Sequence, residues 1–333
     1  MTKSVMQFPG SLLSDNAHIV ASWDIEQGKT YGQVMPLHHP SVLNAALSPI
    51  QVSYTEGMRL NLINAMGVTI GDSIVGLNVC HYLKYVCPEI HINLLRPETP
   101  LPAVDAIYHL ARRTGVIDTF SCLPWPLAYG GDYDVNIDMG NQLYRDSFQS
   151  MEMHDYFYHS VGLAPQSVPD KFKQNCWLQR HFSKSDRSPY ILFCPGASTP
   201  LRAIPDVWHR RIITGLQERY ALPVLGFSPI TLPGYQNISQ QVTTTDAYIN
   251  VIRQADFVYT ADSSALHIAA GFAIPTHAIF TSIDPALRVR YYPQVTWSLP
   301  GSIEPDGAHA SADSQRLAQL HQHYADFYQR GIM

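Results

Sequence analysis

Long apolar runs are absent from this sequence. No stretch reaches the roughly 18 consecutive apolar residues that a membrane-spanning helix needs, and the opening residues lack the apolar run of a signal peptide. We therefore expect a cytoplasmic protein. Cysteine is also scarce: the five cysteines are scattered and show no Cys-x-x-Cys spacing, so neither a disulfide framework nor a zinc site is predicted.

Positive charge is scarce in the first half of the chain. Of the 333 residues, numbers 1–170 include 8 Lys and Arg against 16 Asp and Glu, whereas the remainder has 14 against 11. A nucleic-acid-binding protein would show a face rich in Lys and Arg, so nucleic acid is not an expected partner. The mildly basic second half instead favours a small anionic ligand.

Apolar runs alternate with helical patterns from residue 58 onward, which predicts βαβ units around parallel sheets. The first series has strands at 59–67, 90–95 and 133–140, and helices at 72–86 and 102–115. The second series has strands at 190–198, 223–228, 256–262 and 275–281, and helices at 206–220, 245–255 and 264–273. Two such sheets predict two Rossmann-like α/β domains facing a cleft, with ligands at the carboxyl ends of the strands.

The predicted boundaries follow from these series. The expected parts are an irregular N-terminal extension at 1–57, an N-terminal domain at 58–168, a polar linker at 169–188, a C-terminal domain at 189–310 and a helical segment at 311–333. We expect the last segment, which is amphipathic, to pack back on the N-terminal domain.

The most polar cluster of the second series lies between two apolar runs, at Asp262, Ser263, Ser264 and His267. Asp262 ends a predicted strand, and Ser263 is a good N-cap for the next helix, whose free N–H groups favour an anion such as a phosphate. In the alternative interpretation Ser263 is only a cap and His267 only a buried histidine. A Ser/His/Asp hydrolase is disfavoured because no GxSxG elbow is present.

Two loops carry further candidates. After the strand at 190–198, small residues allow close approach of a diphosphate, and Arg202 supplies a positive charge; the alternative is a plain turn with a surface arginine. In the loop after the first strand, Gly67 and Gly71 precede Asp72, which is either a helix N-cap or a general base.

In this order the three segments resemble glycosyltransferase family 9, the ADP-heptose:lipopolysaccharide heptosyltransferases, over residues 58–300. The family element Asp-Thr-Gly-Leu-x-His corresponds to Asp262-Ser263-Ser264-Ala265-Leu266-His267, followed by AAGFAIP and THAIF. The family's Pro-Gly-Ala loop and basic residue correspond to Pro195-Gly196-Ala197 and Arg202, and its Gly-Asp turn corresponds to Gly71-Asp72.

The resemblance implies a GT-B fold and an inverting, metal-independent transfer of a heptose or related hexose from a nucleotide-diphosphate donor, which in this family is of the ADP type. Asp72 would be the catalytic base, and Gly71 and Ser73 would lie on the acceptor side. The donor diphosphate would contact the residues listed here: Gly196, Ser198, Thr199, Arg202, Asp262, Ser263, Ser264 and His267. The acceptor would be a glycan or glycolipid hydroxyl in cell-surface polysaccharide synthesis, with peripheral association to the inner membrane and no cofactor.

Three departures from the family pattern concern the substrates. Arg202 replaces the usual Lys, and Ile204 replaces a common Trp. The segment 225–237 also lacks the acidic residue that holds the donor ribose in heptosyltransferases. This last departure leaves a second hypothesis open, a non-catalytic or regulatory sugar-nucleotide-binding relative. A Rossmann dehydrogenase is disfavoured because no GxGxxG follows the first strand of either series.

Overall fold

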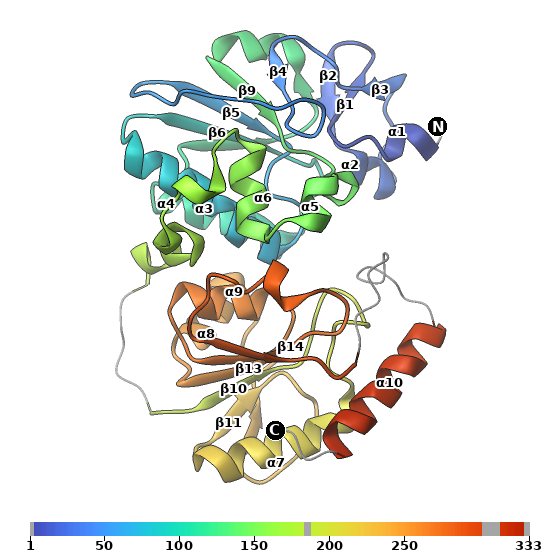
Figure 1. Ribbon diagram of the computed structural model, residues 1–333, viewed down its shortest axis with the longest axis vertical. Helices are drawn as coiled ribbons and strands as arrows, with labels where there is room; N and C mark the ends of the chain where they lie inside the picture. Colours follow the sequence, from blue (N-terminus) through green and yellow to red (C-terminus); the bar gives the residue numbers. More distant parts are fainter. Residues whose placement is uncertain (1–2, 183–187, 302–313, 330–333) are drawn as a thin grey trace. The chain divides into compact units, whose positions relative to one another are not determined.

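The computed structural model describes residues 3–182, 188–301 and 314–329. The chain divides into two compact units, Met1–Lys173 and Gln174–Met333, and each unit has its own parallel sheet (Figure 1). Within the described ranges, none of the helices combines the length and the apolar character that crossing a membrane requires.

The first unit is built on a five-stranded parallel sheet with the order β4-β9-β5-β6-β7. Its strands are β4 (Val42–Leu43), β5 (Arg59–Ile63), β6 (His91–Arg96), β7 (Thr119–Cys122) and β9 (Val135–Asp138). The unit's α-helices are α1 (Lys3–Met6), α2 (Ser22–Glu26), α3 (Ile70–Val86), α4 (Pro102–Arg113), α5 (Asp146–Ser150) and α6 (Met153–Ser160). Strands β5 and β6 bury nearly every side chain, as is typical of parallel sheets in α/β proteins.

The N-terminal segment is an ordered part of this unit, and the prediction of an irregular extension at 1–57 is wrong for its described residues. Strands β1 (Leu12–Ser14), β2 (His18–Val20) and β3 (Val34–Pro36) form an antiparallel sheet with β8 (Trp125–Pro126). Strand β4 adds an edge to the parallel sheet by pairing with β9. Strands of two or three residues are too short to show the alternation on which sequence-based assignment depends.

A buried carboxylate fixes this segment to the end of β9. Asp138 has no exposed surface, and its oxygens accept hydrogen bonds from Ser11 N (2.8 Å), Ser11 Oγ (2.7 Å), Asn44 Nδ2 (3.2 Å) and Gly140 N (2.9 Å). A charged group is tolerated in the interior only when such donors replace water. Residues 11 and 44 therefore belong to the structure that ends β9.

The second unit is built on a six-stranded parallel sheet with the order β12-β11-β10-β13-β14-β15. Its strands are β10 (Ile191–Cys194), β11 (Val224–Gly226), β12 (Tyr235–Asn237), β13 (Phe257–Ala261), β14 (Thr276–Ile279) and β15 (Val295–Ser298). Its α-helices are α7 (Asp206–Tyr220), α8 (Thr245–Arg253), α9 (Ser264–Gly271) and α10 (Ser314–Gln329). The central strand β10 is completely buried.

The structure corrects the predicted partner of the C-terminal helix. Leu320, Tyr324 and Tyr328 of α10 are buried in one cluster with β10 and α7 of the second unit. We expected the helix to pack on the N-terminal domain, but an amphipathic pattern identifies a buried face and not the surface that covers it.

The predicted linker at 169–188 is also more buried than its polar composition suggests. Phe172 and Lys173 are buried in the first unit, and Trp177 and Leu178 are buried in the second. These side chains lie in two short 3₁₀ helices, Asp170–Lys173 and Cys176–Arg180, where neither helical nor strand periodicity can develop. The segment through residue 182 therefore contributes to both cores.

One histidine of the second sheet links stability to pH. The ring nitrogens of His277 on β14 lie 2.9 Å from Thr296 Oγ1 and 3.0 Å from Ser298 Oγ, and burial lowers the pKa of the imidazole to about 4. The unfolded chain, with an ordinary pKa near 6.5, therefore binds this proton first as the pH falls. Stability from this group is complete above pH 6.5 and is lost toward pH 4.

We accordingly expect His277→Gln to lose less stability than the wild type between pH 7 and pH 4.5. Between these two pH values, the Tm of the variant should fall less than that of the wild type, by about 2–4 °C for each kcal/mol of pH-dependent unfolding free energy that His277 contributes. Both Tm values can be measured by circular dichroism. His109→Gln, at an exposed position of α4, is the matched control. Parallel Tm curves for the wild type and His277→Gln would contradict the assignment.

Candidate functional site

The loop between β5 and α3 has an unusual backbone. Asn64, Met66 and Gly67 all have positive φ angles, of 51°, 64° and 69°. Met66 has no exposed surface, and a bulky residue in the left-handed region is rare unless its surroundings impose that conformation. Since backbone strain of this kind concentrates at functional sites, the loop is a candidate on structural grounds alone.

A buried arginine holds this loop in place. Arg96, at the end of β6, is 1 % exposed, and its Nη1 donates to the carbonyl oxygens of Ala65 (2.7 Å) and Gly67 (2.6 Å). Its guanidinium lies over the ring of Tyr108, 4.0 Å from the centroid. The two backbone carbonyls are thereby fixed by a charged donor, which makes stronger hydrogen bonds than a neutral one.

Asp72 lies in the first turn of the helix that follows. The N-cap is Thr69: its hydroxyl accepts from Asp72 N (3.3 Å) and donates to Asp72 Oδ2 (2.7 Å). This reciprocal pairing of the N-cap hydroxyl with the third helical residue fixes the carboxylate in a half-buried position. The alternative in which Asp72 is itself the N-cap is therefore wrong, whereas its role as a base stays a prediction.

The two neighbours of Asp72 differ in their surroundings. Gly71 is half-buried in the first turn of α3. Ser73 has no exposed surface: its Oγ donates to Thr69 O (2.8 Å) and accepts from Tyr108 OH (2.9 Å). Ser73 thus supports the helix start from inside, and its assignment to the acceptor side stays a prediction, as does that of Gly71.

In the second unit, neighbouring strands bring the predicted donor residues together. Strands β10 and β13 are hydrogen-bonded in parallel, so the residues after their carboxyl ends meet at one edge of the sheet. Arg202 Nη2 donates to Ser198 Oγ (2.7 Å), and its Nη1 lies 3.6 Å from Asp262 Oδ2. The side chains of Arg202 and Asp262 are 15 % and 4 % exposed. The arginine is therefore fixed by two partners and is not a plain surface side chain.

The loop around Arg202 leaves room for a ligand. Gly196 and Ser198 are exposed and Thr199 is half-buried. A Cβ built on Gly196 would meet no atom within 4 Å, so the packing of the protein does not itself require glycine at this position. The backbone here is open to close approach from outside.

Helix α9 begins at this edge as the sequence predicts. Ser263 is its N-cap and accepts from Ala265 N at 3.3 Å, while Thr260 Oγ1 lies 3.1 Å from Ser263 Oγ. Ser264, the first helical residue, is half-buried. The positive end of the helix dipole therefore lies next to the Arg202 cluster, an arrangement that favours a negatively charged ligand.

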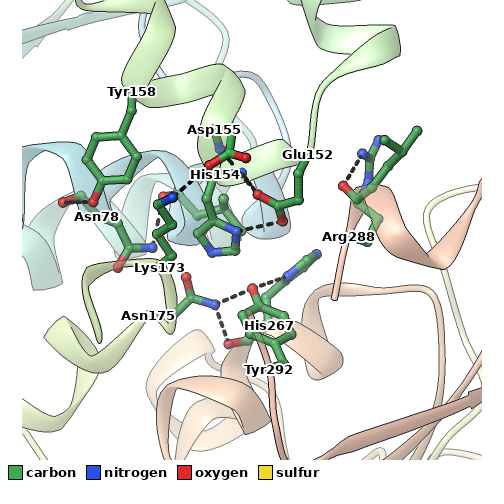
Figure 2. A network of polar contacts seen from close by, with 12 residues as sticks. Asn78, Glu152, His154, Asp155, Tyr158, Lys173, Asn175, His267, Arg288 and Tyr292 are labelled. Carbon is green, nitrogen blue, oxygen red and sulfur yellow. Dashed lines mark hydrogen bonds and ion pairs between the residues drawn. The ribbon is translucent and has the colours of Figure 1, made fainter. Parts of the chain in front are cut away.

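His267 is held by two residues that the sequence analysis missed. Its Nδ1 lies 2.9 Å from Tyr292 OH, and Asn175 Nδ2 donates both to Tyr292 OH (2.7 Å) and to His267 O (2.9 Å), as Figure 2 shows. His267 is 4 % exposed. These contacts agree with a buried, hydrogen-bonded histidine, and a diphosphate contact through Nε2 stays a prediction. No sequence signal pointed to Asn175 or Tyr292, because neither belongs to a recognised motif.

A second buried polar cluster was also missed, this time in the first unit. Glu152 is the N-cap of α6, and its carboxylate accepts from His154 N (2.7 Å) and lies 2.9 Å from His154 Nδ1 (Figure 2). Asp155 forms an ion pair with Lys173 at 2.8 Å. The ion pair between Lys173 and Asp155 holds the last residue of the unit against α6. Among the residues with described structure, no group of three or more His, Cys, Asp and Glu is placed to bind a metal.

Comparisons with known proteins support the fold. No family model matches the sequence, and no curated protein matches it. The structure is similar to the iron-containing dodecameric glycosyltransferase TibC from enterotoxigenic E. coli H10407, with a TM-score of 0.53 and 13% identity, over 84% of this chain and 79% of that chain. TibC in complex with ADP-D-β-D-heptose gives a TM-score of 0.52 and 14% identity, over 84% and 78%.

A further solved structure, E. coli ADP-heptose lps heptosyltransferase II, has a TM-score of 0.49 and 15% identity, over 83% of this chain and all of that chain. At these identities the likeness concerns the fold. The predicted fold class, a GT-B-type α/β protein with two Rossmann-like domains and parallel sheets, is thus confirmed.

Proposed function

We propose that the protein is a glycosyltransferase that moves a sugar from a nucleoside-diphosphate donor to a hydroxyl group of a glycan or glycolipid. The observation that carries the proposal is the cluster of Arg202, Ser198 and the N-terminus of α9 at the carboxyl ends of β10 and β13. A fixed guanidinium next to a helix N-terminus suits a diphosphate, whose negative charge both groups stabilise.

The donor that we favour is an ADP-linked heptose or related hexose. The sequence elements around Asp262 and Arg202 resemble those of heptosyltransferases, and one structure of similar fold is described as a complex with ADP-D-β-D-heptose. The expected acceptor is a component of a cell-surface polysaccharide. Peripheral association with the inner membrane follows from that acceptor and stays a prediction.

The proposed reaction inverts the configuration of the anomeric carbon. Asp72 takes the proton of the acceptor hydroxyl, whose oxygen forms a bond to this carbon from the face opposite the nucleotide. The bond between the anomeric carbon and the diphosphate oxygen breaks, and the leaving nucleoside diphosphate carries the electron pair. Arg202 and the N–H groups at the start of α9 stabilise the negative charge that develops on the leaving diphosphate. Donors held in place in this way before the reaction usually make the largest single contribution to lowering the activation barrier.

A thermal-shift panel tests the donor site. We expect ADP-sugars to raise Tm more than GDP-, UDP- or dTDP-sugars, because the donor that we favour is ADP-linked. A ligand present at 100 times its Kd adds about 2.7 kcal/mol to the stability of the folded state, so tight binding is visible as a higher Tm. Arg210→Gln, at an exposed position of α7, is the control: it removes a positive charge outside the proposed site and should leave the Tm shifts unchanged. If none of the four nucleotide sugars shifts Tm, the donor-site proposal fails.

A non-catalytic sugar-nucleotide-binding protein is the second candidate. It is favoured by the segment 225–237, which contains no Asp or Glu to hold the donor ribose. The two candidates differ in donor hydrolysis: an enzyme should slowly release free nucleotide from its donor, and Asp72→Asn should abolish the release. A Tm shift without any nucleotide release would favour the binding protein.

A further inference from the structure

Gln142 lies next to the loop that carries the proposed base. It begins the short 3₁₀ helix Gln142–Tyr144, which follows β9, the neighbour of β5 in the sheet. A Cβ built on Gly67 would lie 2.7 Å from Gln142 Nε2 and 2.9 Å from Asp72 Cβ. The amide of Gln142 and the side chain of Asp72 therefore border the same glycine.

The side-chain amide of Gln142 has an acceptor that no protein group satisfies among the described residues. Gln142 is 8 % exposed, and its Oε1 is buried without a hydrogen-bond partner among the residues that the structure describes. A buried amide carbonyl without a donor destabilises the fold, so native proteins retain few of them. Such a group beside a strained loop indicates that its partner is a ligand.

The hydrogen-bonding chemistry of Gln142 Oε1 narrows the class of ligand. The two buried arginines nearby donate to the backbone: Arg96 donates to Ala65 O and Gly67 O, and Arg145 donates to Gly140 O (2.9 Å) and Asp138 O (3.0 Å). An amide carbonyl can only accept a hydrogen bond, and an anionic oxygen has no hydrogen to donate to it. A neutral hydroxyl, by contrast, supplies the donor that Gln142 Oε1 lacks.

We propose that Gln142 is an acceptor-binding residue, whose Oε1 accepts a hydrogen bond from a neutral hydroxyl of a sugar and so holds that sugar beside Asp72. The inference rests on the proposed function and deepens it, since it names the group of the acceptor that lies at this point as a sugar hydroxyl. Gln142 contributes to binding and orientation, whereas the proton moves to Asp72.

Two variants and one control test the proposal. Gln142→Ala removes the amide, Gln142→Met replaces it with an apolar side chain of similar length, and Gln166→Ala changes an exposed glutamine of the same unit as a control. The ligand probes are methyl α-glucoside, methyl α-galactoside and methyl α-mannoside, with glucose 6-phosphate as the anionic comparison. Binding to the full chain is followed by saturation-transfer NMR, and the donor site is checked separately with ADP.

We expect at least one methyl glycoside to bind the wild type and Gln166→Ala, and its affinity to fall about tenfold or more in Gln142→Ala and Gln142→Met. The Tm shift caused by ADP should be the same in all four proteins. Without ligand, Gln142→Met should raise Tm by about 2 °C or more, because it removes an unpaired buried carbonyl.

Three results would overturn the proposal. The first is equal glycoside binding by the wild type and Gln142→Ala. The second is that glucose 6-phosphate is the only sugar that binds, or that no sugar binds. The third is a lower Tm for Gln142→Met, which would give Gln142 a role in the fold instead. If sugars bind as expected but ADP does not shift Tm, the donor site fails and the Gln142 site stands. The two proposals can therefore fail separately.

Discussion

Asp72→Asn is expected to lower the rate of sugar transfer by about 10²- to 10⁴-fold, which is the contribution of a positioned general base. Asparagine has the size of aspartate, and its Oδ1 can still accept the hydrogen bond of Thr69 Oγ1, so the helix start should be retained. Donor affinity should change little, because the donor residues belong to the second unit. Turnover is measured with a donor identified by the thermal-shift panel, and affinity by calorimetry.

The matched control for this variant is Asp105→Asn. Asp105 also lies in the first turn of a helix of the first unit, α4, so its replacement removes the same charge from an equivalent position. Equal rate losses in the two variants would point to a general effect of charge. Near-normal turnover of Asp72→Asn with the true acceptor would show that another group takes the proton.

Arg202→Gln is expected to weaken donor binding by about 10- to 150-fold, since a hydrogen bond to a charged group contributes about 1.5–3 kcal/mol. The same change should lower Tm, because Asp262, which is 4 % exposed, loses the cation that lies 3.6 Å from it. Calorimetric titration with ADP measures the first effect, and thermal unfolding measures the second. Arg210→Gln, at an exposed position of α7, should show neither.

A double variant separates the two roles of Arg202. In Arg202→Gln combined with Asp262→Asn, the carboxylate that faces Arg202 is removed together with the guanidinium, so much of the lost stability should return. Donor affinity should stay low, because the positive charge is still missing. Recovery of both properties would mean that Arg202 serves only to neutralise Asp262, and it would refute the proposed diphosphate contact.

Two helices of the second unit could be predicted closely from the sequence. The helix predicted at 206–220 begins and ends at Asp206 and Tyr220, and the helix predicted at 264–273 is α9, Ser264–Gly271. The first is long enough for its helical period to be visible, whereas the second is short and almost completely buried and is recognised by its N-cap, Ser263. The short strands β1 to β4 lack such a signal, because each has only two or three residues, and β2 and β4 also pair with the distant strands β8 and β9.

Some residues of the candidate site could likewise be predicted from the sequence, and others could not. The proximity of Arg202, Ser198 and Asp262 could be predicted, because parallel strands place their carboxyl ends at one edge of a sheet. Asn175 and Gln142 could not, because their partners are distant in sequence and a single asparagine or glutamine has no characteristic spacing. Their roles follow only from tertiary contacts.

The anchoring of the N-terminal segment has a consequence for folding during synthesis. The carboxylate that fixes Ser11 belongs to Asp138, 127 positions later in the chain, and the edge strand β4 pairs with β9. Contacts of such long range form late, because the loop between them must first be closed. The segment that contains β1 to β4 is synthesised before β9 and therefore cannot reach its final structure until β9 has also emerged from the ribosome. Until then its apolar side chains are exposed and prone to association.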